Sequence, residues 1–252
     1  MTIVSISITN NRGIINVKGV VNVKNTMITE LLQYIAPNYC CGCGLVGNLL
    51  CDSCVKNIAL EPFLWCVACS KRPAARDGIC VECKTIGYDR AWAAGAHEGA
   101  LDQAIDTYKF KASRDGVVPL AKLVNEVTPN LPANTIIVPI PTARQHVRER
   151  GFDHMQLLAR RVAKLKGVSA DTSLLKRRTN FVQREATARV RHKQAKDAFF
   201  VRQTLDPDQI YLLIDDVMTT GATIKYAAKA LRKAGAKQVW VVIIARQMLS
   251  KN

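Results

Sequence analysis

The chain has 252 residues, of which 48% are hydrophobic, and a formal net charge of +16. This length and composition suit one medium α/β domain with a small extra module, and exclude a membrane span, which needs an apolar run of about 18 residues. Because no secretory signal pattern opens the sequence, we expect a cytoplasmic protein.

Residues 1–36 are predicted to be an N-terminal extension followed by a short helix. Residues 1–26 alternate weakly and carry no charge before Arg12, and Met27 would make a natural start. We therefore expect residues 1–26 to lie outside the fold. Residues 28–35 have the pattern of a short amphipathic helix.

All nine cysteines lie in residues 37–86, which we expect to form a metal-binding module. In a reducing compartment, C-x-x-C pairs indicate metal binding, and two pairs complete a closed, structural Zn²⁺ site. The simplest pairing is sequential, although crossed pairs, one vacant set, an iron–sulfur cluster or a redox pair are alternatives. Cys41 is the odd cysteine and is not an expected ligand. The expected ligands are Cys40, Cys43, Cys51 and Cys54 in one set, and Cys66, Cys69, Cys80 and Cys83 in the other.

After Cys83 the sequence alternates between strand and helix patterns, and we expect residues 87–247 to form a second domain with its own core. Strand–helix–strand units with short connections form a parallel sheet, with helices on its faces and ligands at the carboxyl ends of its strands. The loops after Ile140 and Ile214 are therefore the expected sites. Strands are predicted at residues 88–96, 134–141, 210–214 and 238–245, and helices at 101–108, 117–127, 152–166 and 222–234.

The positive charge is concentrated in this second part of the chain. Residues 144–202 contain sixteen Lys and Arg against five Asp and Glu, whereas residues 37–99 contain six of each. Phosphorylated small molecules and nucleic acid both suit such a surface, and composition does not separate them. The four histidines, His97, His146, His154 and His192, show no metal-ligand spacing, and we expect them on the surface or in loops.

Arg144, Arg148 and Arg150 follow the strand predicted to end at Pro141. Guanidinium groups bind phosphate oxygens in a bidentate manner, so three of them at a strand end suit a pyrophosphate group. A solvated basic loop is the alternative interpretation.

A second candidate site follows the strand that ends at Ile214. A bound phosphate requires free N–H groups at a helix start, hydroxyl donors and a glycine for a tight turn, and residues 218–223 offer all three. Asp215 and Asp216 would repel each other unless a ribose diol with Mg²⁺ lay opposite them. Ordinary helix capping by Asp216 and Thr219 is the alternative.

The string from Leu213 to Thr223 resembles the phosphoribosyl-pyrophosphate (PRPP) signature of type I phosphoribosyltransferases. The resemblance implies that fold, a parallel sheet with helices on both faces. It also implies that the two aspartates hold the ribose hydroxyls and that the turn holds the 5′-phosphate. The implied PRPP-binding residues are Asp215, Asp216, Val217, Met218, Thr219, Thr220, Gly221, Ala222 and Thr223.

The order of all these features resembles the ComF family of competence proteins, also called GntX. The cysteine pairs, Tyr108-Lys109-Phe110, the V-P-I-P loop, the stretch 179–199 and the PRPP signature follow in the family's order. Asp153-His154 stand where the family has Asn-Gln.

Two functions follow from this resemblance. The first is a cytoplasmic protein that assists internalised single-stranded DNA in transformation or DNA uptake, with DNA-uptake or recombination proteins as partners. The second is an active, Mg²⁺-dependent phosphoribosyltransferase of nucleotide salvage, for which no feature names the acceptor. The catalytic candidates are Asp215, Asp216 and Lys109, and the candidates for nucleic-acid binding are Arg177, Arg178, Tyr108 and Lys109.

Overall fold

The computed structural model describes residues 2–10, 13–21, 38–61, 63–110, 114–178 and 198–248, and the side chains of residues 2–10 and 13–21 and of Phe110 are not among the described ones. By its internal contacts the chain divides into residues 1–38 and residues 39–252. In the first unit, β1 (Thr2–Asn10) and β2 (Gly13–Val21) form an antiparallel hairpin. The helix predicted at 28–35 and His192 lie outside the described residues.

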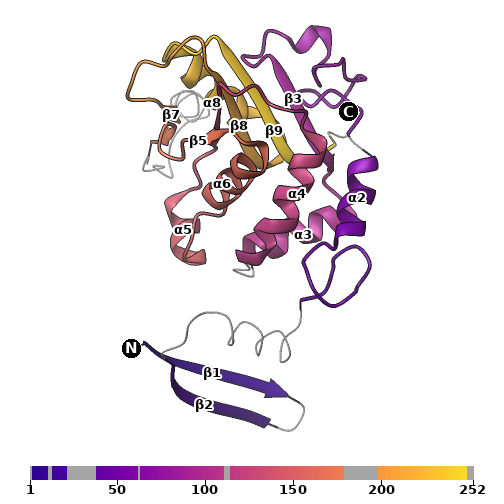
Figure 1. Ribbon diagram of the computed structural model, residues 1–252, viewed down its shortest axis with the longest axis vertical. Helices are drawn as coiled ribbons and strands as arrows, with labels where there is room; N and C mark the ends of the chain where they lie inside the picture. The colour runs from indigo at the N-terminus through magenta and orange to yellow at the C-terminus, as the bar shows by residue number, and fades with distance from the viewer. Residues whose placement is uncertain are drawn as a thin grey trace, which may run out of the picture. The chain divides into compact units, whose positions relative to one another are not determined.

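The second unit is built on a five-stranded parallel sheet in the order β3-β9-β8-β4-β5 (Figure 1). Its central strands are continuous apolar runs, as a parallel sheet covered on both faces requires. This confirms the expected α/β fold of the phosphoribosyltransferase type. The strands are β3 (Arg90–Ala96), β4 (Thr135–Pro139), β5 (Ser169–Ala170), β8 (Ile210–Met218) and β9 (Gln238–Arg246).

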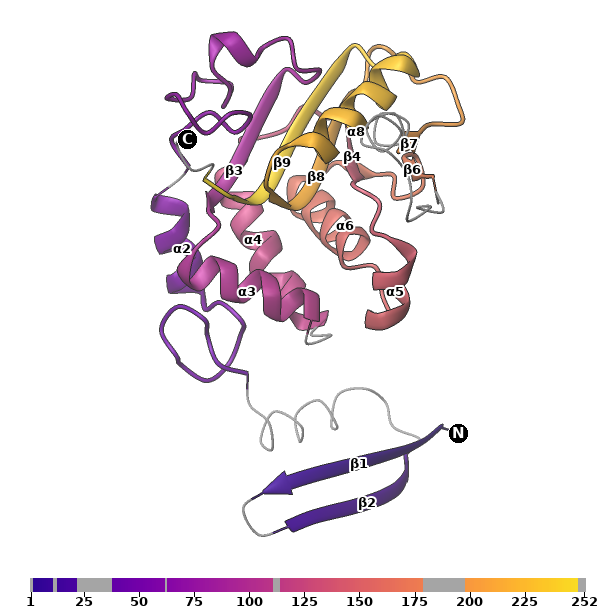
Figure 2. The same cartoon turned by 180° about the vertical axis from the view of Figure 1, so that it is seen from behind.

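Helices cover both faces of this sheet. Alternate residues of each strand point to opposite faces, so that Trp240 and Val242 of β9 pack on one side and Val241 and Ile243 on the other. Helices α3, α4 and α6 lie on the first face (Figure 1), and α8 lies on the second (Figure 2). The helices are α2 (Asp52–Leu60), α3 (Gly99–Phe110), α4 (Val117–Val127), α5 (Arg144–Arg150), α6 (His154–Lys166) and α8 (Ala222–Lys233).

The remaining elements are short. A two-stranded antiparallel pair, β6 (Lys176–Arg177) and β7 (Phe199–Phe200), lies outside the main sheet. Two 3₁₀ turns occur at Val81–Cys83 and Arg114–Gly116. In the part of the chain that is described, no helix has the length and apolar character needed to cross a membrane.

The two cysteine-containing segments pack on opposite faces of the sheet. Cys40, Leu50 and Val55 belong to the apolar cluster that contains α3, α4 and α6. Cys66 and Ile79 belong to the cluster that contains α8. The separate core expected for the cysteine module is therefore wrong, because its apolar side chains complete the two cores of the domain. The boundaries at residues 36/37 and 86/87 stay a prediction about sequence segments.

A close backbone approach fixes the second cysteine segment against the edge strand β3. The amide of Ala91 donates to the carbonyl of Asp77 at 2.8 Å. A Cβ on Gly78 would overlap the carbonyl group of Ala91, so only glycine fits at this position. The segment covers the open edge that β3 would otherwise present.

Candidate functional site

The phosphate turn lies where the sheet changes direction. The chain leaves β4 through α6 toward β5, and leaves β8 through α8 toward β9 on the opposite side, which places a crevice between the ends of β4 and β8. The last β4–β8 register pair is Pro139 with Ile214. Strand β8 continues to Met218 alongside β9, four residues further than the sequence predicted, and this extension carries both aspartates.

Asp216 is held by two cationic or polar side chains from other elements. Lys109, near the end of α3, places Nζ 3.0 Å from one carboxylate oxygen of Asp216. His154, at the start of α6, places Nε2 2.8 Å from the other oxygen. Arg150 Nη1 lies 3.0 Å from His154 Nδ1. A guanidinium can only donate, so Nδ1 accepts and the imidazole proton is on Nε2, where it donates to Asp216.

The two neighbouring aspartates have opposite electrostatic environments. Burial and the negative charge of Asp216 raise the pKa of Asp215 well above its ordinary value. Burial also raises the pKa of Asp216, but the hydrogen bond from His154 and the charge of Lys109 outweigh it and bring that pKa to about 2. Asp216 is therefore the ionised member of the pair. An added cation would stabilise the ionised form of Asp215 more than that of Asp216.

His154 was expected on the surface or in a loop, and that expectation is wrong. Its side chain is buried, and it lies edge-on to the ring of Tyr108. Tyr108 donates its hydroxyl proton to the carbonyl of His154 at 2.6 Å, and Asp153 caps α6 by accepting from the amides of residues 155 and 156. Of the two residues that differ from the family pattern, Asp153 therefore caps α6 and His154 contacts Asp216.

Two other histidines lie near acidic residues at or close to the surface. His146 on α5 is exposed and lies 3.1 Å from Glu149, and His97 lies 2.9 Å from Asp102. These positions agree with the expected surface and loop placement. Neither group belongs to a cluster that could hold a metal among the described residues.

The turn after β8 presents its hydroxyl groups to solvent. Thr219, Thr220 and Thr223 are exposed, and α8 begins at Ala222 directly behind them. Gly221 caps this helix with a φ of 78°, a left-handed conformation that favours glycine. A helix start of this kind directs N–H groups and the positive end of the helix dipole toward an anion.

A basic cavity of about 680 Å³ lies beside the carboxyl end of β4. Arg144 and Arg148, one turn apart on α5, line it together with Lys176, Arg177 and Arg178. The arginines of the proposed pyrophosphate loop therefore stand on a helix, and two of them share a cavity with the two arginines assigned to nucleic acid. Arg150 is not among the residues that line this cavity, and its Nη1 lies 3.0 Å from His154 Nδ1, so a joint role of the three arginines in pyrophosphate binding stays a prediction.

Aromatic rings support the basic side chains on one wall of this cavity. The guanidinium of Arg177 lies 5.7 Å from the ring centre of Phe199, and that of Arg178 lies 5.5 Å from that of Phe200. Arg202 lies over the Phe200 ring as well, at 5.7 Å. Cation–π contacts of this kind hold the charges in place while leaving N–H donors for an anion.

The eight C-x-x-C cysteines form two clusters, with sequential pairing as the sequence predicted. Within each cluster the sulfur atoms lie within 4.8 Å of one another, and pairs such as Cys43–Cys51 and Cys69–Cys80 lie 3.7 and 3.9 Å apart. Sulfurs around a tetrahedral Zn²⁺ are about 3.8 Å apart, since each Zn–S bond is about 2.3 Å. The residues therefore fit a closed four-thiolate metal site.

A backbone amide donates to a buried sulfur atom in each cluster. The amide of Cys51 donates to Cys40 Sγ at 3.3 Å, and that of Cys80 donates to Cys66 Sγ at 3.2 Å. Burial raises the pKa of Cys40, but amide donors outweigh it and lower that pKa to about 6. Metal ligands must be deprotonated, and the lowered pKa of Cys40 favours that form at one of the four ligands.

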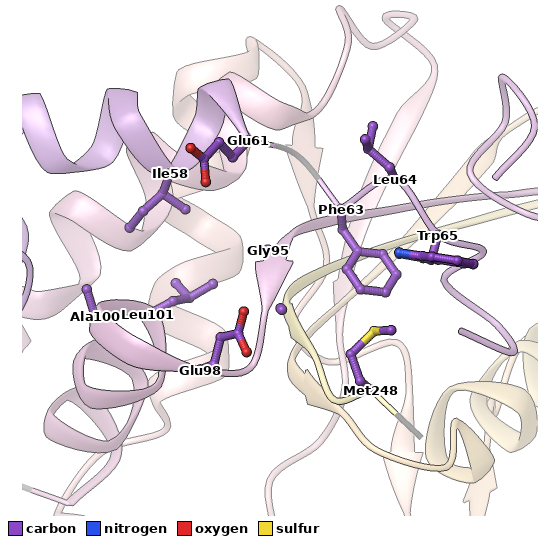
Figure 3. Close-up of a pocket in the computed structure, with 11 residues that line it drawn as sticks. Ile58, Glu61, Phe63, Leu64, Trp65, Gly95, Glu98, Ala100, Leu101 and Met248 are labelled. Atoms are coloured by element: carbon purple, nitrogen blue, oxygen red, sulfur yellow. The ribbon is translucent and has the colours of Figure 1, made fainter. Parts of the chain in front are cut away.

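A partly apolar groove of about 450 Å³ lies near the carboxyl end of β3 (Figure 3). Phe63, Trp65 and Met248 gather on one side of it, and the carboxylates of Glu61 and Glu98 lie on the other (Figure 3). None of these residues was singled out in the sequence, because each is an isolated apolar or acidic residue in its own segment.

Comparisons with known proteins agree with this geometry. Residues 150–251 match the model of the phosphoribosyl transferase domain. The chain is 26% identical to competence protein F of Haemophilus influenzae, over 80% of this chain and 92% of that protein. It is 28% identical to the DNA utilization protein YhgH of Salmonella typhi, over 79% of this chain and 97% of that protein.

Solved structures give a distant match. The glutamine PRPP amidotransferase of B. subtilis aligns with 55% of this chain and 30% of its own, at 16% identity and a TM-score of 0.39. A hypoxanthine phosphoribosyltransferase of Staphylococcus aureus aligns with 60% of this chain and 70% of its own, at 13% identity and a TM-score of 0.31.

The curated relatives share most of their length with this chain, the matched domain contains the turn at 215–223, and two four-cysteine clusters precede it. The chain is therefore similar over most of its length to competence protein F and to the DNA utilization protein YhgH, and its residues 150–251 match a phosphoribosyl transferase domain.

Proposed function

We propose that this protein binds PRPP with Mg²⁺ at residues 215–223 and uses the neighbouring basic cavity to handle internalised single-stranded DNA. The proposal rests on three features that lie together at the end of β8: paired aspartates, exposed threonine residues and the start of a helix. Such a set of groups suits a ribose that carries a phosphate.

Each part of PRPP has a counterpart in this arrangement. The hydroxyls of Thr219, Thr220 and Thr223 and the amides at the start of α8 would hold the 5′-phosphate. Asp215 and Asp216 would hold the ribose diol. Mg²⁺ bound with PRPP would supply a positive charge that stabilises the ionised form of Asp215. Lys109 already occupies one oxygen of Asp216, so it would neutralise the aspartate until the ligand arrives.

The basic cavity supports a role in binding polyanions. Arg144, Arg148, Arg177 and Arg178 surround one volume, which fits a pyrophosphate group or two successive phosphates of a DNA strand. Because these arginines share the cavity, pyrophosphate and DNA should compete there. From the sequence, Arg177 and Arg178 were candidates for nucleic-acid binding, and Arg144 and Arg148 were candidates for pyrophosphate binding.

The names of the relatives favour the DNA role over a purely metabolic one. The matched proteins are called competence protein F and DNA utilization protein, and the match extends over nearly the whole of each. We therefore propose DNA-uptake or recombination proteins as partners, a cytoplasmic location, and Zn²⁺ as the metal of both cysteine clusters. Tyr108 is excluded from direct DNA contact in the described conformation, because its side chain is buried.

A transferase activity is the second candidate function. It is favoured by Lys109 and Asp216, which form a partly buried ion pair beside the proposed ribose site. In such a reaction a nucleophile would displace pyrophosphate from C1 of the ribose, and the cavity arginines would stabilise the departing charge. Production of pyrophosphate from PRPP with a panel of nucleobases tests this function separately.

Calorimetry with PRPP and Mg²⁺ tests the first part of the proposal. The double variant Asp215→Ala with Asp216→Ala should lose measurable binding, because both ribose-binding carboxylates are gone. Equal affinity of the double variant and the parent would place the ligand elsewhere.

The DNA role is tested with a labelled single-stranded oligonucleotide. Charge reversal by Arg177→Glu with Arg178→Glu should weaken DNA binding, and the affinity of the parent should fall steeply with salt, because binding releases counterions. The matched control is Lys229→Glu with Lys233→Glu, which makes the same charge change on exposed residues of α8 outside the cavity. If the two double variants lose the same amount of DNA affinity, DNA binding depends on net charge alone, and the proposal that DNA binds in the cavity is wrong.

A further inference from the structure

Arg246, the last residue of β9, is fully buried and makes an unusual set of contacts. Its guanidinium donates only to backbone carbonyls, which come from three separate segments of the chain. The acceptors are Val67 at 2.6 Å, Ala68 at 3.1 Å, Met218 at 2.8 Å, Gln247 at 2.8 Å and Thr219.

Two of these segments belong to sites described above. Val67 and Ala68 are the residues between Cys66 and Cys69, so their carbonyls belong to a metal-binding knuckle of the second cysteine cluster. Met218 and Thr219 begin the phosphate turn. One side chain thus connects the two sites by direct hydrogen bonds.

The charge of Arg246 has no carboxylate partner. Among the ion pairs of the described residues none involves Arg246, and a buried cation without an anion is costly. The cysteines Cys66 and Cys69 flank Val67 and Ala68, whose carbonyls accept from its guanidinium. Four thiolates around a divalent metal carry a net charge of about −2, so the loaded cluster would supply the missing counter-charge.

The first cysteine cluster is attached to the domain at a different place. It packs on the opposite face of the sheet, and the neighbouring residue Asp52 forms an ion pair with Lys122 on α4.

We propose that Arg246 is a positioning residue that couples the second cysteine cluster to the phosphate turn. Cys66, Cys69, Cys80 and Cys83 would fix the knuckle when they bind a metal and would supply the counter-charge, and Arg246 holds the carbonyls of Met218 and Thr219 in the conformation that receives a phosphate. This inference rests on the proposed PRPP site and adds that its affinity depends on the state of the second cluster.

The planar fork of arginine is what this connection requires. An arginine presents donors in several fixed directions, whereas a lysine has a single ammonium group that cannot reach carbonyls on both sides. Arg246→Lys therefore keeps the charge and removes the bridge. Arg232→Lys is the matched control, since Arg232 also donates to backbone carbonyls, those of Gly87, Ala236 and Lys237, near the far end of α8.

The first measurement is hydrogen–deuterium exchange of the peptide that covers residues 216–223, with zinc content measured in parallel. We expect faster exchange of this peptide in Arg246→Lys than in the parent and in Arg232→Lys, with metal retained. Unchanged exchange would overturn the proposed positioning role, and this result does not depend on whether PRPP binds.

The second measurement is calorimetry of the same three proteins with PRPP and Mg²⁺. Loss of hydrogen bonds from a charged group that orders the turn should weaken binding about tenfold in Arg246→Lys. Equal affinities would refute the coupling, whereas absence of binding in the parent would refute the proposed function and leave the exchange result to decide the role of Arg246.

The third measurement uses the parent alone and remains decisive if Arg246→Lys does not fold. Coupling between two sites is reciprocal, so PRPP should perturb the visible absorption of Co²⁺ bound in place of zinc. A cobalt spectrum that stays the same at saturating PRPP would overturn the coupling.

Discussion

Asp215 and Asp216 are adjacent, yet replacing each by asparagine should change stability in opposite directions. Asp216 is ionised against Lys109 and His154, and its pKa falls from an ordinary 3.8 to about 2. Such a shift stabilises the folded state by about 2 kcal/mol above pH 4. Asp216→Asn should therefore lower the melting temperature at pH 7 by roughly 4 to 8 °C for a domain of this size.

Asp215→Asn should raise the melting temperature of the ligand-free protein at pH 7. Burial and the charge of Asp216 raise the pKa of Asp215, so the ionised form is destabilising in the folded state. An amide keeps an oxygen for the amide of Asp216, which donates to Asp215 at 3.0 Å, and removes the repulsion. The same variant should bind PRPP more weakly, because it lacks a carboxylate for the diol.

The pH dependence separates the two effects. A carboxyl whose folded pKa is raised gains stability as the pH falls through that pKa, so the advantage of Asp215→Asn over the parent should shrink on acidification. The decrease in melting temperature caused by Asp216→Asn should stay constant from pH 8 to pH 5. It should disappear only as the pH falls through about 2. Calorimetric melting of the three proteins across this range tests both trends. Destabilisation by both substitutions at pH 7 would refute the assignment of opposite environments.

Three further predictions concern the structure around the site. Gly221→Ala should weaken PRPP binding, because φ is 78° at this residue and the new Cβ would displace Met218. Gly235→Ala, at the far end of α8, should lower stability with little effect on PRPP binding. Calorimetry measures the binding and thermal melting measures the stability of the two variants. Tyr108→Phe should lower the free energy of unfolding by about 1 kcal/mol in denaturant titration, since it leaves the buried carbonyl of His154 without its donor. Cys51→Ser with Cys54→Ser should lower the melting temperature of the whole domain in one transition, and a separate early transition would contradict the shared core.

The sequence predicted the parallel sheet because its strands are short continuous apolar runs. Residues 210–214 and 238–245 could be placed from this pattern alone. The continuation of β8 through Asp215 and Asp216 could not, since paired carboxylates are poor strand formers and the extension depends on pairing with β9. The helix α5 was missed for a related reason, because Arg144–Arg150 has only one apolar residue and so no helical periodicity.

The cysteine clusters were predicted well because ligand spacing is a local property. C-x-x-C fixes two thiolates on one knuckle, and the sequential pairing of knuckles agrees with the simplest expectation. The contact between these knuckles and the sheet is a tertiary property that no spacing reveals. The change of sequence pattern after Cys83 suggested a separate core for the second domain, whereas Cys40 and Cys66 are each buried in a core of the sheet.

The least predictable part of the site is the set of partners around the phosphate turn. Lys109 was a candidate from its neighbours in sequence, but nothing indicated that His154 would reach Asp216 or that Arg246 would reach Met218. Arg246 follows a continuous apolar run in β9, where a polar side chain is unexpected and must find a partner, whereas His154 follows Asp153 among polar residues at the start of α6. A basic residue within the last apolar strand is therefore a signal that could have been used.

These partners hold the turn from two sides. On one side His154 and Lys109 fix the carboxylate of Asp216 at the end of the strand, and on the other Arg246 fixes the carbonyls that follow it. The intervening backbone spans only Asp216 to Thr219, so both anchors constrain the same few peptide groups. A turn held in this way loses little conformational entropy when a phosphate binds, and preorganisation of this kind increases affinity without adding contacts to the ligand.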